Sequence, residues 1–148
     1  MVRPAVRLAL ALVGAGGIAA VAVAATSGSF TAEQAAQGRS IYEDRCAVCH
    51  ESALKGSSHG PALAGAAFAT RWRGRSTADL LTFIRAMMPP GQAGNLSDQE
   101  YLAVTAYILS ANGHAAGAAP LAADTARPVV VADGGNAAPI PAHDSGPS

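Results

Sequence analysis

The aromatic residues of this chain are confined to its middle part. Aromatic side chains bury more apolar area per residue than most others, so they show where a core can form. The 148-residue sequence contains one Trp, three Tyr and three Phe, at Phe30, Tyr42, Phe68, Trp72, Phe83, Tyr101 and Tyr107. We therefore predict one packed unit of about 80 residues, a size that usually needs a covalent link or a cofactor to stabilise it.

Residues 1–25 have the pattern of a secretion signal. Arg3 and Arg7 precede an uncharged, mostly apolar run over residues 8–25 that ends in small residues, as cleaved signal peptides do. An uncleaved membrane anchor over residues 8–25 is the alternative, because about 18 residues is close to the minimum for crossing a bilayer. Both interpretations predict export to the periplasm, with membrane attachment only if the segment stays uncleaved.

Residues 114–148 are predicted to be a disordered tail. They are rich in Ala, Pro and Gly, contain no aromatic residue, and have one concentrated apolar run at Val129–Val131. Such a composition buries too little surface to offset the entropy lost on ordering the chain. The compact domain is accordingly predicted over residues 30–113.

Local start signals predict the first and last helices of that domain. Thr31, followed three residues later by Gln, predicts a capping box that opens a helix over residues 32–44. Ser97, followed three residues later by Glu, predicts the same for a helix over residues 98–111, which Asn112-Gly113 ends. On the first helix Gly38 leaves room for another helix to approach closely, although a glycine can also occur there by chance.

An apolar pattern predicts one more helix between them. Leu80, Phe83, Ile84 and Met87 recur at the spacing of one helical face, which indicates a helix over residues 77–87. No stretch of the domain alternates as a strand would. We therefore predict an all-α fold with long loops at 51–76 and 88–96.

The chemistry of the chain is concentrated in one pentapeptide, Cys46-Ala47-Val48-Cys49-His50. Two thiols three residues apart lie on one side of a helical turn, where both can add to the vinyl groups of one porphyrin, and the histidine follows on the proximal side of the iron. A dithiol redox pair, half of a zinc site and a structural disulfide are the alternatives. The trailing histidine and the predicted export favour covalent haem c.

Residues 31–113 resemble the single-haem class I cytochromes c. The order and spacing of several segments carry this likeness: Gly38 and Tyr42, the pentapeptide, Gly60-Pro61-Ala62-Leu63, Trp72, Met88-Pro89-Pro90-Gly91 and Tyr101. The stretch 88–101 is further similar to cytochrome domains that serve quinoprotein alcohol dehydrogenases. The resemblance implies a small all-α cytochrome c fold, with helices around one covalently bound haem c.

The resemblance also implies His50 and a methionine as the two axial ligands of the iron. Met88 precedes a proline, which disfavours the helical conformation, so we predict it on an extended segment that can turn its sulfur toward the iron. Met87 continues the apolar pattern of its helix and is predicted to pack in the core. His59 is the one histidine that competes with Met88 as a ligand.

Two more residues are predicted at the cofactor. In the family-like segment Gly60-Pro61-Ala62-Leu63, the resemblance implies that the Pro61 carbonyl accepts a hydrogen bond from Nδ1 of His50, which would orient the ring; an ordinary turn proline is the alternative. Trp72 is expected to donate its indole N–H to a haem propionate, or else to be a core residue without that role.

These features predict a periplasmic carrier of single electrons. Ten basic and ten acidic residues balance, so nothing in the net charge indicates a nucleic-acid partner. A quinoprotein dehydrogenase is the expected electron donor, and an oxidase or another cytochrome the expected acceptor. The alternative is a haem enzyme or gas sensor, which would require Met88 to be absent from the iron or easily displaced.

Overall fold

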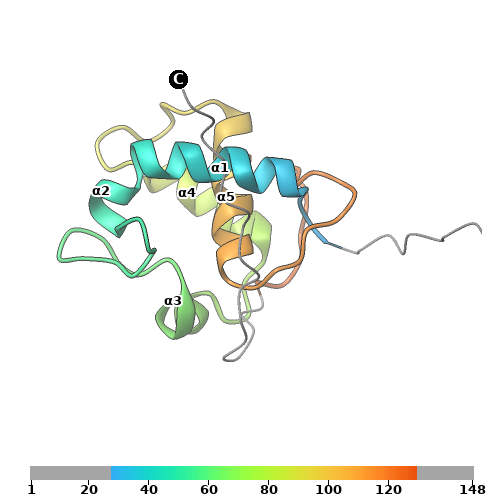
Figure 1. Cartoon of the computed structure of the whole chain (residues 1–148), viewed down its shortest axis with the longest axis horizontal. Coiled ribbons are helices and arrows are strands. Elements are labelled where there is room, and N and C mark those ends of the chain that lie inside the picture. The colour runs from blue at the N-terminus through green and yellow to red at the C-terminus, as the bar shows by residue number, and fades with distance from the viewer. Residues whose placement is uncertain (1–27, 130–148) are drawn as a thin grey trace, which may run out of the picture.

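The computed structural model describes residues 28–129, and within them the fold is entirely helical (Figure 1). An isolated bridge between Ser76 and Pro128 is the one strand-like pairing in this part of the chain. No helix of residues 28–129 is both long and apolar enough to cross a membrane. The all-α prediction is therefore confirmed. The helices are α1 (Ala32–Arg45), α2 (Ala47–His50), α3 (Gly65–Trp72), α4 (Thr77–Met87) and α5 (Asp98–Ala111).

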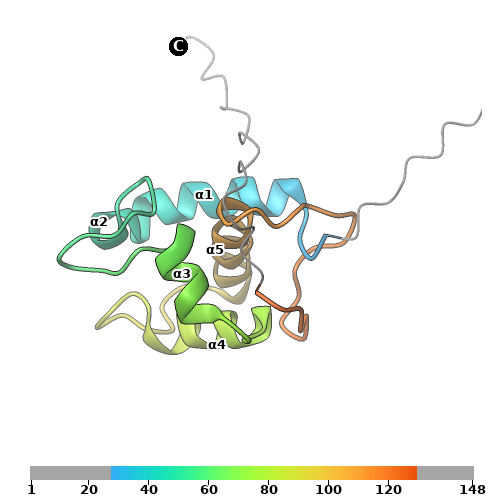
Figure 2. The same cartoon turned by 90° about the horizontal axis from the view of Figure 1, so that it is seen from below.

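The close crossing of α1 and α5 forms the centre of the fold (Figures 1 and 2). Gly38 of α1 lies directly against the backbone of Ala103 and Val104 on α5, and a Cβ at residue 38 would overlap the Ala103 carbonyl. Nearby, the rings of Tyr42 and Tyr107 lie 5.2 Å apart between centroids. The close approach predicted at Gly38 is therefore present.

The start signals of α1 and α5 behave differently. At α5, the Ser97 side chain accepts from the Glu100 N–H and the Glu100 carboxylate accepts from the Ser97 N–H, as predicted. At α1, Thr31 accepts from the Gln34 N–H, but the Gln34 side chain does not complete a capping box. Its amide bonds instead to the backbone of Leu121, donating over 3.1 Å and accepting over 2.7 Å.

The buried face of α4 is rotated from the one that the sequence predicts. Its buried residues are Thr77, Leu80, Leu81 and Ile84, which themselves follow the i, i+3, i+4, i+7 spacing. Met87 lies roughly a quarter turn off the centre of that face. Its side chain is 53% exposed, so the prediction that Met87 packs in the core is wrong.

Helix α3 lies inside the segment predicted as a loop over residues 51–76. Ala64 occupies its N-cap position, where no side chain accepts a hydrogen bond, so the usual start signal is missing from the sequence. The helix is stabilised by burial of Phe68 and Trp72, which are four residues apart and share one face. Trp72 also packs edge-on against Phe83 of α4, at 5.6 Å between ring centroids.

The segment after α5 packs on the domain, which differs from the disordered tail predicted from residue 114 onward. Leu121 and Val129 are buried, and the Thr77 hydroxyl of α4 donates to the Thr125 carbonyl. Together with the two hydrogen bonds between Gln34 and Leu121, these contacts attach the segment to the domain although it contains few large apolar residues. Residues 130–148 of the predicted tail, and the predicted signal segment 1–25, lie outside the described residues.

Truncation of Leu121 tests whether residues 114–129 contribute to stability. We expect Leu121→Ala to lower the free energy of unfolding by about 2 kcal/mol, because a buried leucine loses its packing. Urea unfolding of the holoprotein measures this change. Ala123→Ser, on an exposed position of the same segment, is the matched control and should leave the stability unchanged. Equal stability of Leu121→Ala and the parent chain would contradict the packing.

Candidate haem site

The Cys-x-x-Cys-His pentapeptide folds as a single helical turn at the end of α1. Cys46 ends α1 and begins α2, and its N–H donates to the Tyr42 carbonyl over 2.8 Å. The N–H groups of Cys49 and His50 both donate to the Cys46 carbonyl, over 3.1 and 3.0 Å. Both thiols are free and partly exposed. The turn therefore presents two unlinked thiols and an imidazole from one short element.

The Cys46 thiol does not have the character of the attacking thiol of a redox dithiol. Burial of Cys46 raises the pKa of its thiol to about 11, and the negative charge of an ionised Cys49 adds to the rise. Reactive dithiols need the opposite shift, because the thiolate is the attacking species. Within residues 28–129, no group of three or more His, Cys, Asp and Glu side chains could hold a metal ion.

His50 is fixed in one orientation and one tautomer. Its side chain is 6% exposed, and Nδ1 lies 2.7 Å from the Pro61 carbonyl oxygen. A carbonyl can only accept, so Nδ1 carries a proton, and in the neutral imidazole Nε2 is then the nitrogen with the free lone pair. This is the arrangement in which an imidazole ligates a metal through Nε2 while its other nitrogen is held by a backbone oxygen.

A glycine allows the backbone to pass against this ring. A Cβ at Gly60 would lie 2.9 Å from both Cε1 and Nδ1 of His50, so a larger residue there would displace the imidazole. Beyond the ring, the Tyr42 hydroxyl donates to the Glu51 carbonyl over 2.7 Å, and the Gly56 N–H donates to the His50 carbonyl over 3.0 Å. The donor set and its surroundings fit a covalently attached haem with one proximal imidazole.

Met88 lies immediately after α4 in an extended conformation. Its φ of −125° and ψ of 144° depart from the helix, while its N–H still donates to the Ile84 carbonyl. The side chain is partly buried and packs against the core. Both views place the loop after α4 at the same end of the molecule as α2 (Figures 1 and 2). The extended backbone predicted for the residue before Pro89 is therefore present, and the ligand role of Met88 stays a prediction.

The two remaining candidates from the sequence, Trp72 and His59, differ in burial. Trp72 is buried, 4% exposed, and the Arg75 guanidinium lies over its ring at 5.6 Å; its bond to a propionate stays a prediction. His59 is exposed, and its backbone N–H donates to the Ser57 hydroxyl within the same loop.

Asn112, which the sequence indicates as a helix stop, also supports the loop that holds His50. Its amide donates to the Leu63 carbonyl and to the Ile108 carbonyl, each over 2.8 Å, and its oxygen accepts from the Gly65 N–H. Asparagine followed by glycine indicates a helix end, but no local signal indicates the partners Leu63 and Gly65, which are 49 and 47 positions away in the sequence. Asn112 thereby ties the end of α5 to the segment that follows Pro61.

Comparison with known proteins decides the family. Residues 33–108 match the family described as cytochrome c oxidase, cbb3-type, subunit III, and the match covers just over half of the 148 residues. The chain belongs to this cytochrome c family. The predicted resemblance to class I c-type cytochromes is thereby confirmed, and haem c is the cofactor.

One relative of this cytochrome is named as a dehydrogenase. The chain is 32% identical over 78 residues to a thiosulfate dehydrogenase of Psychrobacter arcticus, covering 48% of this chain and 24% of that protein. The chain thus spans about a quarter of the length of that relative.

Two solved structures are also similar to this cytochrome. One is the sulfane dehydrogenase SoxCD from Paracoccus pantotrophus, with 26% identity, coverage of 53% of this chain and 43% of that chain, and a TM-score of 0.45. The other is cytochrome cL from Hyphomicrobium denitrificans, with 24% identity, coverage of 52% and 46%, and a TM-score of 0.41.

Proposed function

We propose that this cytochrome carries single electrons between redox partners in the periplasm, with His50 and Met88 as the two axial ligands of one haem c attached through Cys46 and Cys49. The observation that carries the proposal is the hydrogen bond from Nδ1 of His50 to the Pro61 carbonyl at 2.7 Å. This bond leaves Nε2 as the ring nitrogen that can ligate the iron. His50 directly follows Cys49, and both Cys46 and Cys49 have free thiols.

Each of these residues has a distinct physical task. The bound cofactor supplies an iron that alternates between Fe(II) and Fe(III). The Pro61 carbonyl keeps the His50 ring oriented and raises its basicity as a ligand. Met88 would supply a sulfur ligand opposite His50, which would raise the reduction potential and would leave no open position on the iron for a substrate or gas. The burial of His50 keeps water from competing for the proximal position.

The partner proposal rests on sequence similarity. The relative at 32% identity is a thiosulfate dehydrogenase, which supports a dehydrogenase of a small substrate as the electron donor. An oxidase or another cytochrome then accepts the electron.

The quinoprotein dehydrogenase predicted from residues 88–101 is a narrower form of the proposed donor. The proposed export to the periplasm rests on the sequence pattern of residues 1–25. Co-purification from a native periplasmic extract identifies the donor.

Optical spectra of the purified holoprotein test the proposed axial ligands. We record the oxidised, the reduced and the carbon monoxide-treated reduced forms. A low-spin c-type spectrum that carbon monoxide does not change is the expected result, because both axial positions are filled. A high-spin spectrum, or rapid binding of carbon monoxide, would overturn the proposal in favour of an open distal site, as in a haem enzyme or gas sensor.

A further inference from the structure

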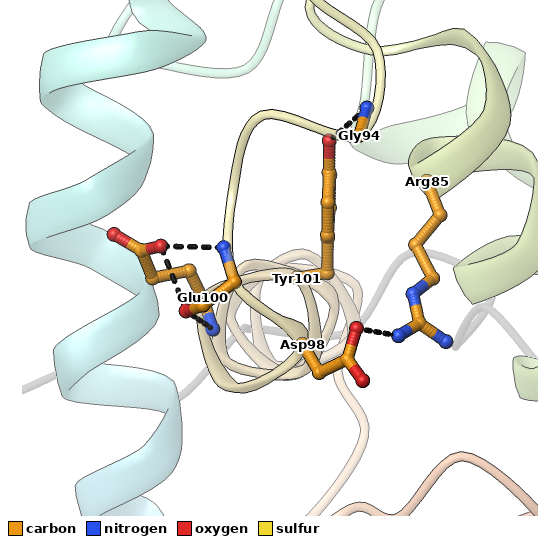
Figure 3. Close-up of polar contacts among 6 residues, drawn as sticks. Arg85, Gly94, Asp98, Glu100 and Tyr101 are labelled. Carbon is orange, nitrogen blue, oxygen red and sulfur yellow. Dashed lines mark hydrogen bonds and ion pairs between the residues drawn. The ribbon is translucent and has the colours of Figure 1, made fainter.

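One buried hydroxyl joins the two ends of the loop that follows α4. Tyr101 lies in the first turns of α5 and is 2% exposed. Its hydroxyl donates to the Met88 carbonyl over 2.9 Å and accepts from the Gly94 N–H over 2.8 Å. Figure 3 shows the ring pointing out of α5 toward Gly94. A single side chain thus closes the loop from Met88 to Gly94.

The loop itself has little rigidity of its own. Residues 90–95 are exposed, and two backbone bonds, Gln92 to Pro89 and Asn95 to Gln92, connect the loop to itself. Gly91 and Gly94 have φ near +76° and +78°, conformations that glycine adopts at the cost of a large loss of freedom on folding. A loop of this composition needs a contact with the core to hold one conformation.

The element that supplies this contact is firmly held. The capping box of Ser97 and Glu100 fixes the start of α5, and the Thr105 hydroxyl donates to the Tyr101 carbonyl over 2.8 Å. An ion pair between Arg85 of α4 and Asp98 joins the two helices that flank the loop (Figure 3). The Tyr101 hydroxyl is therefore a fixed point from which the loop can be positioned.

We propose that Tyr101 is a positioning residue that holds Met88 in place as the axial ligand of the iron. This inference rests on the proposed function, because it takes the Met88 sulfur as the ligand. The bond from the Tyr101 hydroxyl to the Met88 carbonyl opposes any shift of the Met88 backbone that would carry the sulfur away from the iron. Tyr101 thereby makes ligand dissociation less favourable without touching the iron itself.

Tyr101→Phe tests this positioning role in the holoprotein. The substitution keeps the ring and its packing and removes both hydrogen bonds. Imidazole is added to the ferric form. The loss of the sulfur-to-iron charge-transfer absorbance then measures how fast imidazole replaces the sulfur. We expect replacement to become about tenfold faster, since the lost hydroxyl contacts stabilise the closed loop by roughly one hydrogen bond or slightly more.

Tyr107→Phe is the matched control. It removes a hydroxyl from the same helix, about 9 Å further along its axis, where the ring packs on Tyr42 rather than on the loop. Imidazole should replace the sulfur in this variant at the parent rate. Equal rates in Tyr101→Phe and Tyr107→Phe would overturn the positioning role.

A second readout follows the loop directly. Amide hydrogen exchange at Gly94, measured by NMR on the ferrous form, should be faster in Tyr101→Phe because the Gly94 N–H loses its acceptor. Unchanged exchange at Gly94 would overturn the inference.

Met88→Leu separates the two proposals: if that variant keeps the charge-transfer absorbance, the ligand assignment fails. If it loses the absorbance while Tyr101→Phe behaves as the parent chain, the positioning role alone fails.

Discussion

Met88→Leu is expected to open the iron to carbon monoxide. Leucine has nearly the volume of methionine, so the packing of this partly buried side chain changes little, but it has no sulfur to donate. The reduced variant should bind carbon monoxide readily, and its reduction potential should fall, because a methionine ligand raises the potential. Optical spectra with and without carbon monoxide, together with a potentiometric titration, measure both changes.

Met87→Leu is the control for this substitution. The neighbouring methionine is 53% exposed, so the same chemical change one residue earlier should leave spectrum, potential and carbon monoxide reactivity unaltered. If Met88→Leu stays six-coordinate and inert to carbon monoxide, Met88 is not the ligand. His59→Ala then shows whether the histidine that competes with Met88 occupies the position instead.

Gly38→Ala is expected to destabilise the holoprotein by about 3 kcal/mol. Two effects of opposite sign compete. Alanine favours a helix over glycine by about 1 kcal/mol, so at an open position the substitution would stabilise α1. At residue 38 the new Cβ overlaps the Ala103 carbonyl of α5. Because both partners are helical backbone, neither can move aside without separating α1 from α5. Urea unfolding measures the change.

Gln37→Ala is the control at the adjacent position of α1. Gln37 is exposed, and alanine there should shift the free energy of unfolding by no more than about 0.5 kcal/mol. A stabilised Gly38→Ala variant would contradict the close crossing, because helix propensity would then outweigh the contact with α5. The sign of the change is therefore sufficient to decide the question.

Helices with local start and stop signals were predicted closely. Helix α5 begins and ends where the capping box at Ser97 and the Asn112-Gly113 stop indicate, and α4 ends where Met88 precedes Pro89. These signals act within three or four residues, so they can be recognised without knowing the fold. The hydrogen bond from His50 to the Pro61 carbonyl was predicted as well, on the strength of a family resemblance rather than of local signals.

Two features that depend on distant partners were not predicted. Helix α3 has no capping side chain and forms around the burial of Phe68 and Trp72. Residues 114–129 are ordered by bonds such as the pair between Gln34 and Leu121, which are 87 positions apart in the sequence. Composition alone suggested disorder there, because it does not reveal a partner elsewhere in the chain.

Short segments of the sequence were enough to predict two thiols and an imidazole in one helical turn, a methionine held off its helix by a proline, and N-terminal caps for the first and last helices. Folding then brings together the groups that hold these parts in place. It places the Pro61 carbonyl against Nδ1 of His50 and the Tyr101 hydroxyl between Met88 and Gly94. Caps and proline effects act over a few residues, so they can be recognised in the sequence, whereas contacts between distant residues exist only after the chain has folded.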